Sequence, residues 1–220
     1  EGVGDILEPH QRDRLVIVNV RKTMNTEWLA WGLNNGINSS ILGWVKDTPQ
    51  LFHSFEDVKN PDDNPYIFHP NQQRTSFVTP RSLHMASDLV HQRDTLGDNI
   101  LTSALMGTIG ERGALDLMAY VKLIDKMPSR DDIKNNPQTA KIPDSVSATV
   151  MVVFRSLGSM TKDFVTPFME YLVRLDAEAQ AMFVNGVRAK NYQHQTIVMT
   201  NQKFTEWAMK NQHLYQADKK

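Results

Sequence analysis

The sequence predicts a mainly α fold, a helical bundle preceded by one β-strand. From residue 25 onward, apolar side chains recur every three or four residues, which is the spacing of one helix face. In contrast, the run Leu-Val-Ile-Val-Asn-Val at residues 15–20 is β-branched and almost continuously apolar, as in strands buried on both faces of a parallel sheet. One strand cannot make a sheet, so we expect this run to be the remnant of a larger α/β unit.

Two short helices are predicted directly after the strand. Asn25 can cap the first, which Gly36 ends, and the second spans residues 39–46. The next stretch, residues 47–79, contains four prolines among many Asn, Asp and Gln residues, a composition typical of loops. Several Leu, Phe and Tyr side chains interrupt it, so we expect a long but ordered connection.

The rest of the chain is predicted to be helical, with short connections. The expected helices span residues 80–92, 100–109, 114–124, 129–136, 145–157, 167–175, 176–190 and 201–215. Pro128 stops the third of them, and Ser129 with Asp132 has the spacing of a capping box that starts the fourth. The segment 145–157 is apolar on two sides, which predicts a central position in the core. Pro167 is interpreted as a helix start, because proline is favoured in the first turn.

Composition limits the classes of partner. The chain has 220 residues with 24 basic and 25 acidic side chains, so its net charge of -1 gives no support to nonspecific DNA binding, and a nucleic-acid partner is not expected. The absence of cysteine excludes disulfides, cysteine-ligated zinc and a thiol nucleophile, and is compatible with a cytoplasmic setting. No window approaches the roughly 20 apolar residues that cross a bilayer, so no membrane association is expected.

The sequence lacks the motifs of a complete ATP-hydrolysing site. We find no glycine loop followed by Lys-Ser/Thr, and no apolar strand that ends in an acidic pair. The nearest glycine cluster, residues 107–113, lies between predicted helices, where helix-end and packing roles are favoured. Because the chain opens with Glu1 rather than Met, and residues 2–5 lead into a strand-like run, we expect a fragment or processed product whose missing chemistry lies upstream.

Metal binding is not expected from the histidine pattern. None of the seven histidines forms a helical pair with a nearby glutamate of the metalloprotease type. His84 and His91 share one helix face, but only Asp88 joins them there. No metal ligands are therefore assigned.

The segment Phe-Val-Thr-Pro-Arg-Ser-Leu at residues 77–83 carries the sharpest functional signal. Thr79 is a natural N-cap and Pro80 suits the first helical position, so Arg81 should project from the exposed start of an amphipathic helix. A cation at this end opposes the helix dipole, which counts against a purely structural role. The alternative is a solvated helix end, with Arg81 merely the first member of a polar stripe.

A second candidate site precedes the predicted strand. Arg12 and Arg14 lie in the run Gln-Arg-Asp-Arg-Leu at residues 11–15, and alternation along an extended chain would point them in opposite directions. An arginine at a subunit edge can neutralise charge that develops on a γ-phosphate. The alternative is that both are surface arginines paired with Glu8 and Asp13.

Together, these segments resemble the MoxR-like and dynein-related branches of the AAA+ ATPases, of phage or bacterial type. The segment 77–83 resembles their sensor 2 region, and residues 11–15 resemble the segment that supplies an arginine finger. Between and after them, the tryptophan-containing helices at 27–45 and the glycines at 107–113 occur in a similar order. The resemblance covers roughly residues 2–157, without the Walker motifs.

The resemblance implies a specific architecture. Residues 1–24 would be the end of the AAA+ α/β nucleotide-binding core, and residues 25–157 the helical lid. Residues 158–220 would be a C-terminal helical extension.

The resemblance also implies a function. Arg81 would contact ATP, with Mg²⁺ held by residues outside this chain, and Arg12, or else Arg14, would be the arginine finger. The subunits would form a homo-oligomeric ring that remodels a protein substrate, and this chain alone would be inactive. The alternative function is a non-enzymatic helical scaffold for protein or DNA, whose contact surface would include the early tryptophans Trp28, Trp31 and Trp44.

Overall fold

The computed structural model describes residues 14, 16 and 22–212, and the regular structure in these ranges is helical. The α-helices are α2 (Asn25–Asn34), α3 (Ser39–Asp47), α4 (Pro80–His91), α5 (Arg93–Ile109), α6 (Glu111–Ile124), α7 (Arg130–Asn135), α8 (Val146–Gly158), α9 (Lys162–Leu172), α10 (Ala177–Arg188), α11 (Gln195–Met199) and α12 (Gln202–Lys210). The mainly α fold class is therefore confirmed. The predicted strand lies outside the described residues except for Val16, whose side chain is 92% exposed.

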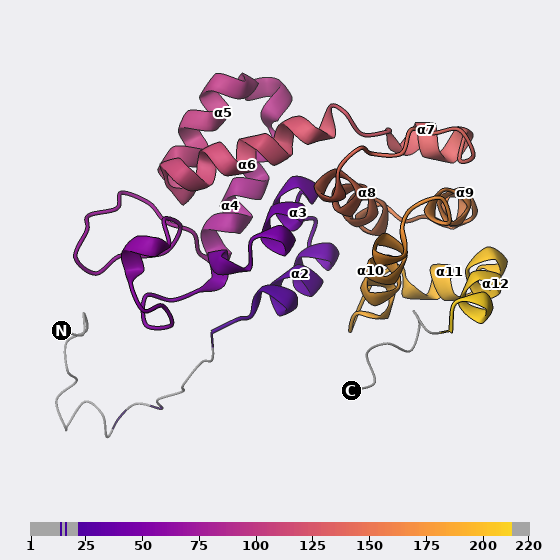
Figure 1. Cartoon of the computed structure of the whole chain (residues 1–220), viewed down its shortest axis with the longest axis horizontal. Helices are drawn as coiled ribbons and strands as arrows, with labels where there is room; N and C mark the ends of the chain where they lie inside the picture. Colours follow the sequence, from indigo (N-terminus) through magenta and orange to yellow (C-terminus); the bar gives the residue numbers. More distant parts are fainter. Residues whose placement is uncertain (1–13, 15, 17–21, 213–220) are drawn as a thin grey trace.

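Helices α2 to α6 pack together on one side of the molecule (Figure 1). The predicted amphipathic pattern of α4 is confirmed, because Leu83, Ala86 and Val90 are buried against this group. Removing each leucine- or valine-sized side chain from water stabilises the fold by about 1.5–3 kcal/mol. Trp44 on α3 is also buried, and its ring packs edge-on against the Tyr66 ring with 5.9 Å between the ring centroids.

Helix α8 connects this group to α7 and α9–α12, which form the other side of the molecule (Figure 1). Every residue from 148 to 154 is buried, and α8 packs against α3, α6 and α10. Asp47 at the end of α3 accepts hydrogen bonds from the Tyr120 hydroxyl at 2.9 Å and from the Ser147 hydroxyl at 2.6 Å. The prediction of a central helix at residues 145–157 is confirmed.

The long connection between α3 and α4 is ordered, as predicted. It contains two 3₁₀ helices, η1 (Pro49–Phe52) and η2 (Pro61–Asp63). Leu51 and Tyr66 are buried and anchor it to the core, whereas Phe68 stays 44% exposed.

The predicted start of a helix at Pro167 is wrong, because α9 begins at Lys162 and Pro167 lies inside it. Proline removes the hydrogen bond to the carbonyl four residues earlier, at Asp163, and an interior proline costs about 3 kcal/mol or more. Phe164 and Phe168 on either side of it are fully buried. Packing of this aromatic face compensates for the proline.

Several boundaries also differ from the sequence prediction. Helix α5 begins at Arg93 rather than near residue 100, and it is interrupted at Gly97, which has a φ of 73°. Because of this break, the apolar periodicity is recognisable only after it. Helix α11 was not predicted, since its five residues are too few to show a periodic pattern.

Among the helices of the described ranges, none is both long and apolar enough to cross a membrane.

Candidate functional site

The start of α4 is fixed by a reciprocal cap. The Thr79 hydroxyl accepts a hydrogen bond from the backbone N–H of Ser82 at 3.0 Å, and the Ser82 hydroxyl accepts one from the backbone N–H of Thr79 at 2.8 Å. The Ser82 hydroxyl also lies 3.1 Å from the Phe77 carbonyl, to which it can donate. Pro80 occupies the first turn as predicted. These bonds hold the backbone that carries Arg81 in one conformation.

The Arg81 side chain is exposed in the first turn of α4. In the part of the chain that the structure describes, its guanidinium has no carboxylate within ion-pair distance and no hydrogen-bond partner. A cation there faces the positive end of the helix dipole without a compensating anion. The group can therefore donate several hydrogen bonds to an anionic ligand such as a phosphate.

The polar stripe predicted on α4 faces outward. Arg81, His84, Asp88 and His91 are all exposed. The His84 ring packs edge-on against the Trp31 ring with 5.5 Å between the ring centroids. His91 Nε2 lies 3.0 Å from the Gly36 carbonyl oxygen. The stripe thus runs beside α2 and the turn that follows it. In the described ranges, no cluster of His, Asp and Glu has the composition of a metal site.

The three early tryptophans separate into two kinds. Trp28 and Trp44 are 4% and 1% exposed and belong to the core, so they are not available as a contact surface. Trp31 is 42% exposed beside His84. Of the three tryptophans that the scaffold alternative would use, only Trp31 is exposed, whereas the exposed helix faces that it would also use stay a prediction.

The two arginine-finger candidates, Arg12 and Arg14, lie ahead of the described helices. Arg12 lies outside the described residues. Arg14 is described as an exposed residue in a turn. The assignment of either arginine to a neighbouring subunit's phosphate stays a prediction.

The glycine cluster at residues 107–113 joins α5 to α6. Gly110 has a φ of 83°, and a Cβ there would lie 2.8 Å from the Ser76 carbonyl oxygen, so glycine is required. Gly113 packs against the Trp44 ring. These are the helix-end and packing roles favoured by the sequence.

A groove of about 740 Å³ lies beside this junction and was not predicted. It is lined by the loop at residues 74–76 and by the ends of α5 and α6. Arg112 at its edge donates to the Asp116 carboxylate at 3.0 Å, and Asp116 also accepts from the Tyr66 hydroxyl at 2.6 Å. Burial, followed by this hydrogen bond, raises the pKa of Tyr66. Because Arg112 is already paired and Glu111 adds a carboxylate, the groove is not suited to phosphate.

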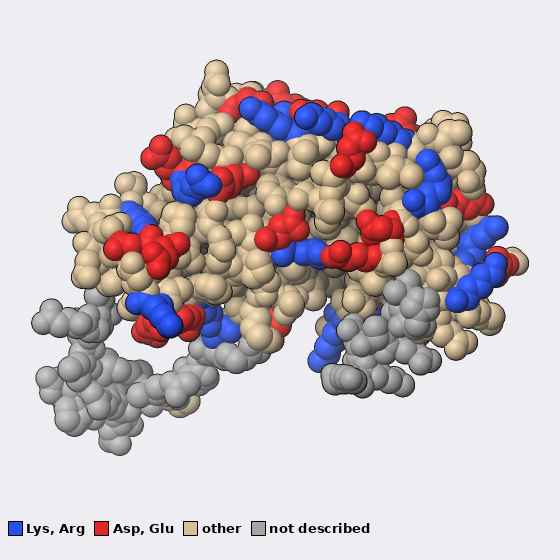
Figure 2. Space-filling view, viewed as in Figure 1, with Lys and Arg blue, Asp and Glu red and all other residues tan. Residues whose placement is uncertain are grey.

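Basic and acidic side chains are interspersed over the face shown in Figure 2. The described part of that face has no extended basic surface of the kind that tracks a nucleic-acid backbone.

No protein-family model, curated protein or solved structure matches the chain.

Proposed function

We propose that this chain is the C-terminal part of a MoxR-like AAA+ ATPase and that Arg81 contacts the phosphates of ATP. The observation that carries this proposal is the exposed Arg81 guanidinium on a capped helix start, where it has no carboxylate or hydrogen-bond partner among the residues that the structure describes. We choose ATP as the ligand because residues 77–83 resemble the sensor 2 segment of these ATPases. The rest of the ATP site, including the Walker motifs and the residues that hold Mg²⁺, would lie on polypeptide outside this sequence.

In this proposal Arg81 acts as a phosphate ligand. Its planar guanidinium would donate paired hydrogen bonds to phosphate oxygens and stabilise the negative charge there during transfer. Arg12 is our first choice for the arginine finger that reaches the nucleotide of a neighbouring subunit, and Arg14 is the second. Such sharing of the site requires a homo-oligomeric ring, which we place in the cytoplasm.

The packing of α4 explains how the lid would respond to the nucleotide. Arg81 lies on the exposed face, while Leu83 and Ala86 on the opposite face are fully buried against the other lid helices. A force on Arg81 would therefore move α4 together with its bundle rather than bend one loop. We propose that this movement remodels a protein substrate.

The test is ATP turnover by the upstream-extended protein carrying Arg81→Ala. Loss of one preorganised donor to transition-state charge should lower turnover by roughly 10²-fold. Lys162→Ala is a matched control, because Lys162 is also an exposed cation in the first turn of a helix, α9. Normal turnover by Arg81→Ala, or an equal loss in Lys162→Ala, would contradict the proposal.

The exposure of Trp31 favours one second candidate, a non-enzymatic scaffold that contacts protein or DNA through α2. The two proposals predict different gene sequences upstream of residue 1. The ATPase requires a glycine loop with Lys-Ser/Thr and an acidic pair ahead of residue 1. A start codon directly beside Glu1 would favour the scaffold.

A further inference from the structure

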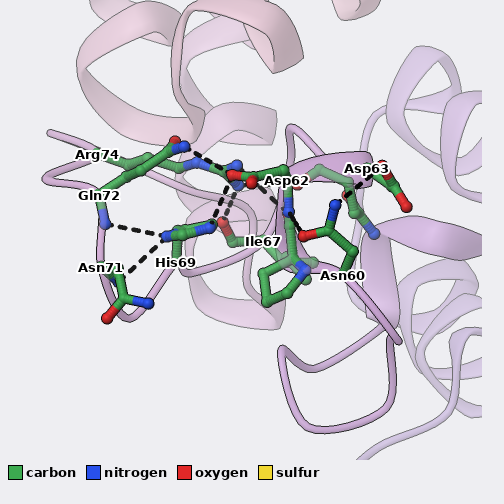
Figure 3. A network of polar contacts seen from close by, with 10 residues as sticks. Asn60, Asp62, Asp63, Ile67, His69, Asn71, Gln72 and Arg74 are labelled. Atoms are coloured by element: carbon green, nitrogen blue, oxygen red, sulfur yellow. Dashed lines mark hydrogen bonds and ion pairs between the residues drawn. The ribbon is translucent and has the colours of Figure 1, made fainter.

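The loop ahead of α4 contains a partly buried arginine whose hydrogen bonds within the described residues all go to backbone carbonyls. Arg74 Nη1 donates to the Asn64 carbonyl at 2.8 Å and to the Ile67 carbonyl at 2.6 Å, and Nη2 lies 3.5 Å from the Pro61 carbonyl (Figure 3). One guanidinium therefore connects three points of an irregular loop. Both Nη1 hydrogens are engaged in this way, although Arg74 also lies along the neighbouring groove.

A continuous path of hydrogen bonds leads from this loop to the start of α4. The Asn64 side chain is 5% exposed; its amide donates to the Gln50 carbonyl at 2.9 Å and its oxygen accepts from the Tyr66 N–H at 3.0 Å. The Tyr66 carbonyl in turn accepts from the Val78 N–H at 2.7 Å. Val78 is buried and directly precedes the N-cap Thr79. Displacement of residues 64–66 would therefore shift the cap.

A histidine closes the far end of the same loop. His69 Nδ1 accepts from the backbone N–H groups of Asn71 at 3.1 Å and Gln72 at 2.9 Å (Figure 3). Because Nδ1 is an acceptor, the ring proton lies on Nε2, 3.0 Å from Asp62 Oδ1. The ring is 6% exposed. The loop around Arg74 is thus fixed on both sides.

We propose that Arg74 is a positioning residue for Arg81. By holding the carbonyls of residues 61–67 together, it keeps Tyr66 in place to bind Val78, which sets where α4 begins and in which direction Arg81 projects. Arg74 acts through the backbone and does not touch the phosphate. This inference rests on the proposed function of Arg81 as a phosphate ligand.

The first test measures amide hydrogen exchange and needs no nucleotide. Arg74→Gln should raise exchange by roughly tenfold at the hydrogen-bonded amides within residues 78–83, which are those of residues 78, 79, 82 and 83, because the path that protects the cap is lost. Arg174→Gln is the matched control: Arg174 Nη1 also donates to two carbonyls, those of Pro137 at 2.7 Å and Ala140 at 2.9 Å, but between other elements. Unchanged exchange at residues 78–83 in Arg74→Gln, or an equal rise there in Arg174→Gln, would overturn the proposal.

A milder variant keeps the test informative if Arg74→Gln does not fold. Arg74→Lys preserves the positive charge but not the planar fork that spans the Asn64 and Ile67 carbonyls. It should raise exchange at residues 78–83 by less than Arg74→Gln does, and it should lower turnover. If Arg74 contacted a phosphate as a simple charge, Arg74→Lys would retain turnover, which would overturn a positioning role.

The second test is a double-mutant cycle of ATP turnover in the upstream-extended protein. Arg74→Gln should lower kcat more than it raises KM, and it should cause no further loss in an Arg81→Ala background, because its effect passes through Arg81. An independent, additive loss would overturn the positioning role. If Arg81→Ala alone leaves turnover unchanged, the proposed function fails, while the exchange result still decides whether Arg74 sets the start of α4.

Discussion

The two ends of α4 hold arginines in opposite situations. Arg93, just after its C-terminal end, donates to Asp98 at 2.9 Å and to both oxygens of Asp125 at 2.9 and 3.0 Å. The hydrogen bonds to Asp125 and then to Asp98 raise the pKa of Arg93. Arg81, at the N-terminal end, has no such partner in the described part of the chain and faces an unfavourable dipole.

This difference separates a structural cation from one that is available to a ligand. Arg93 connects the start of α5 to the residue that follows α6, so its charge is used inside the fold. Within the described ranges Arg81 forms no ion pair or hydrogen bond through its side chain, yet the cap around it is built from several hydrogen bonds. A rigid backbone under an unused cation is the arrangement expected of a binding residue.

The largest expected effect tests whether the two faces of α4 are as distinct as this comparison requires. Leu83→Ala removes a fully buried side chain and should destabilise the protein by about 2–5 kcal/mol, through lost burial and the resulting cavity. Met85→Ala is the control on the same helix, because Met85 is 53% exposed. Denaturant unfolding measures both. Similar losses in the free energy of unfolding for the two variants would show that Met85 is also packed in the fold, and that the two faces of α4 do not differ in burial.

An intermediate effect concerns acid stability and tests the structural role of Arg93. Its hydrogen bonds lower the pKa values of Asp98 and Asp125 from 3.8. A lowered folded-state pKa contributes stability that is complete above the unfolded value and is lost as pH falls through the folded value. Wild type should therefore exceed Arg93→Gln in stability at neutral pH, by less than the Leu83→Ala effect, and this advantage should shrink below pH 3.8.

Unfolding of the two proteins across this pH range measures the advantage directly. Asp163, whose pKa is lowered to about 2 by Lys134 and then Thr161, titrates in both proteins and cancels in the difference. A difference that stays constant with pH would mean that Arg93 stabilises the fold by packing and not through its carboxylate partners.

The start of α4 could be predicted because several local signals agree there. Thr79, Pro80 and the apolar spacing of Leu83 and Ala86 each indicate the same boundary, and the structure confirms it. At Pro167 the local signal conflicted with tertiary packing, and packing determined the outcome. The split between Trp28 and Trp31 likewise depends on contacts between helices, which residue spacing alone did not resolve.

The network around Arg74 could not be predicted from the sequence. Its guanidinium binds the main-chain carbonyls of Pro61, Asn64 and Ile67. Every residue type has the same main-chain carbonyl, so the side chains at these positions give no sign of the contact. In a helix or strand, periodicity would show which residues meet, but this loop has none. The sequence therefore indicated an ordered connection without indicating what orders it.

The smallest expected effect is on stability and tests the comparison most directly. Arg81→Glu replaces an exposed cation with an anion in the first turn of α4, where the helix dipole favours negative charge. Stability should rise by about 0.3–1 kcal/mol at low ionic strength and by less at high salt. Arg81→Gln, which removes the charge without reversing it, should give a smaller rise, and denaturant unfolding at two salt concentrations measures both.

Destabilisation by Arg81→Glu would mean that the arginine makes a contact that stabilises the fold, and the distinction from Arg93 would then disappear. A variant that is more stable but loses ATP turnover would instead show that the unfavourable position of Arg81 is retained for binding.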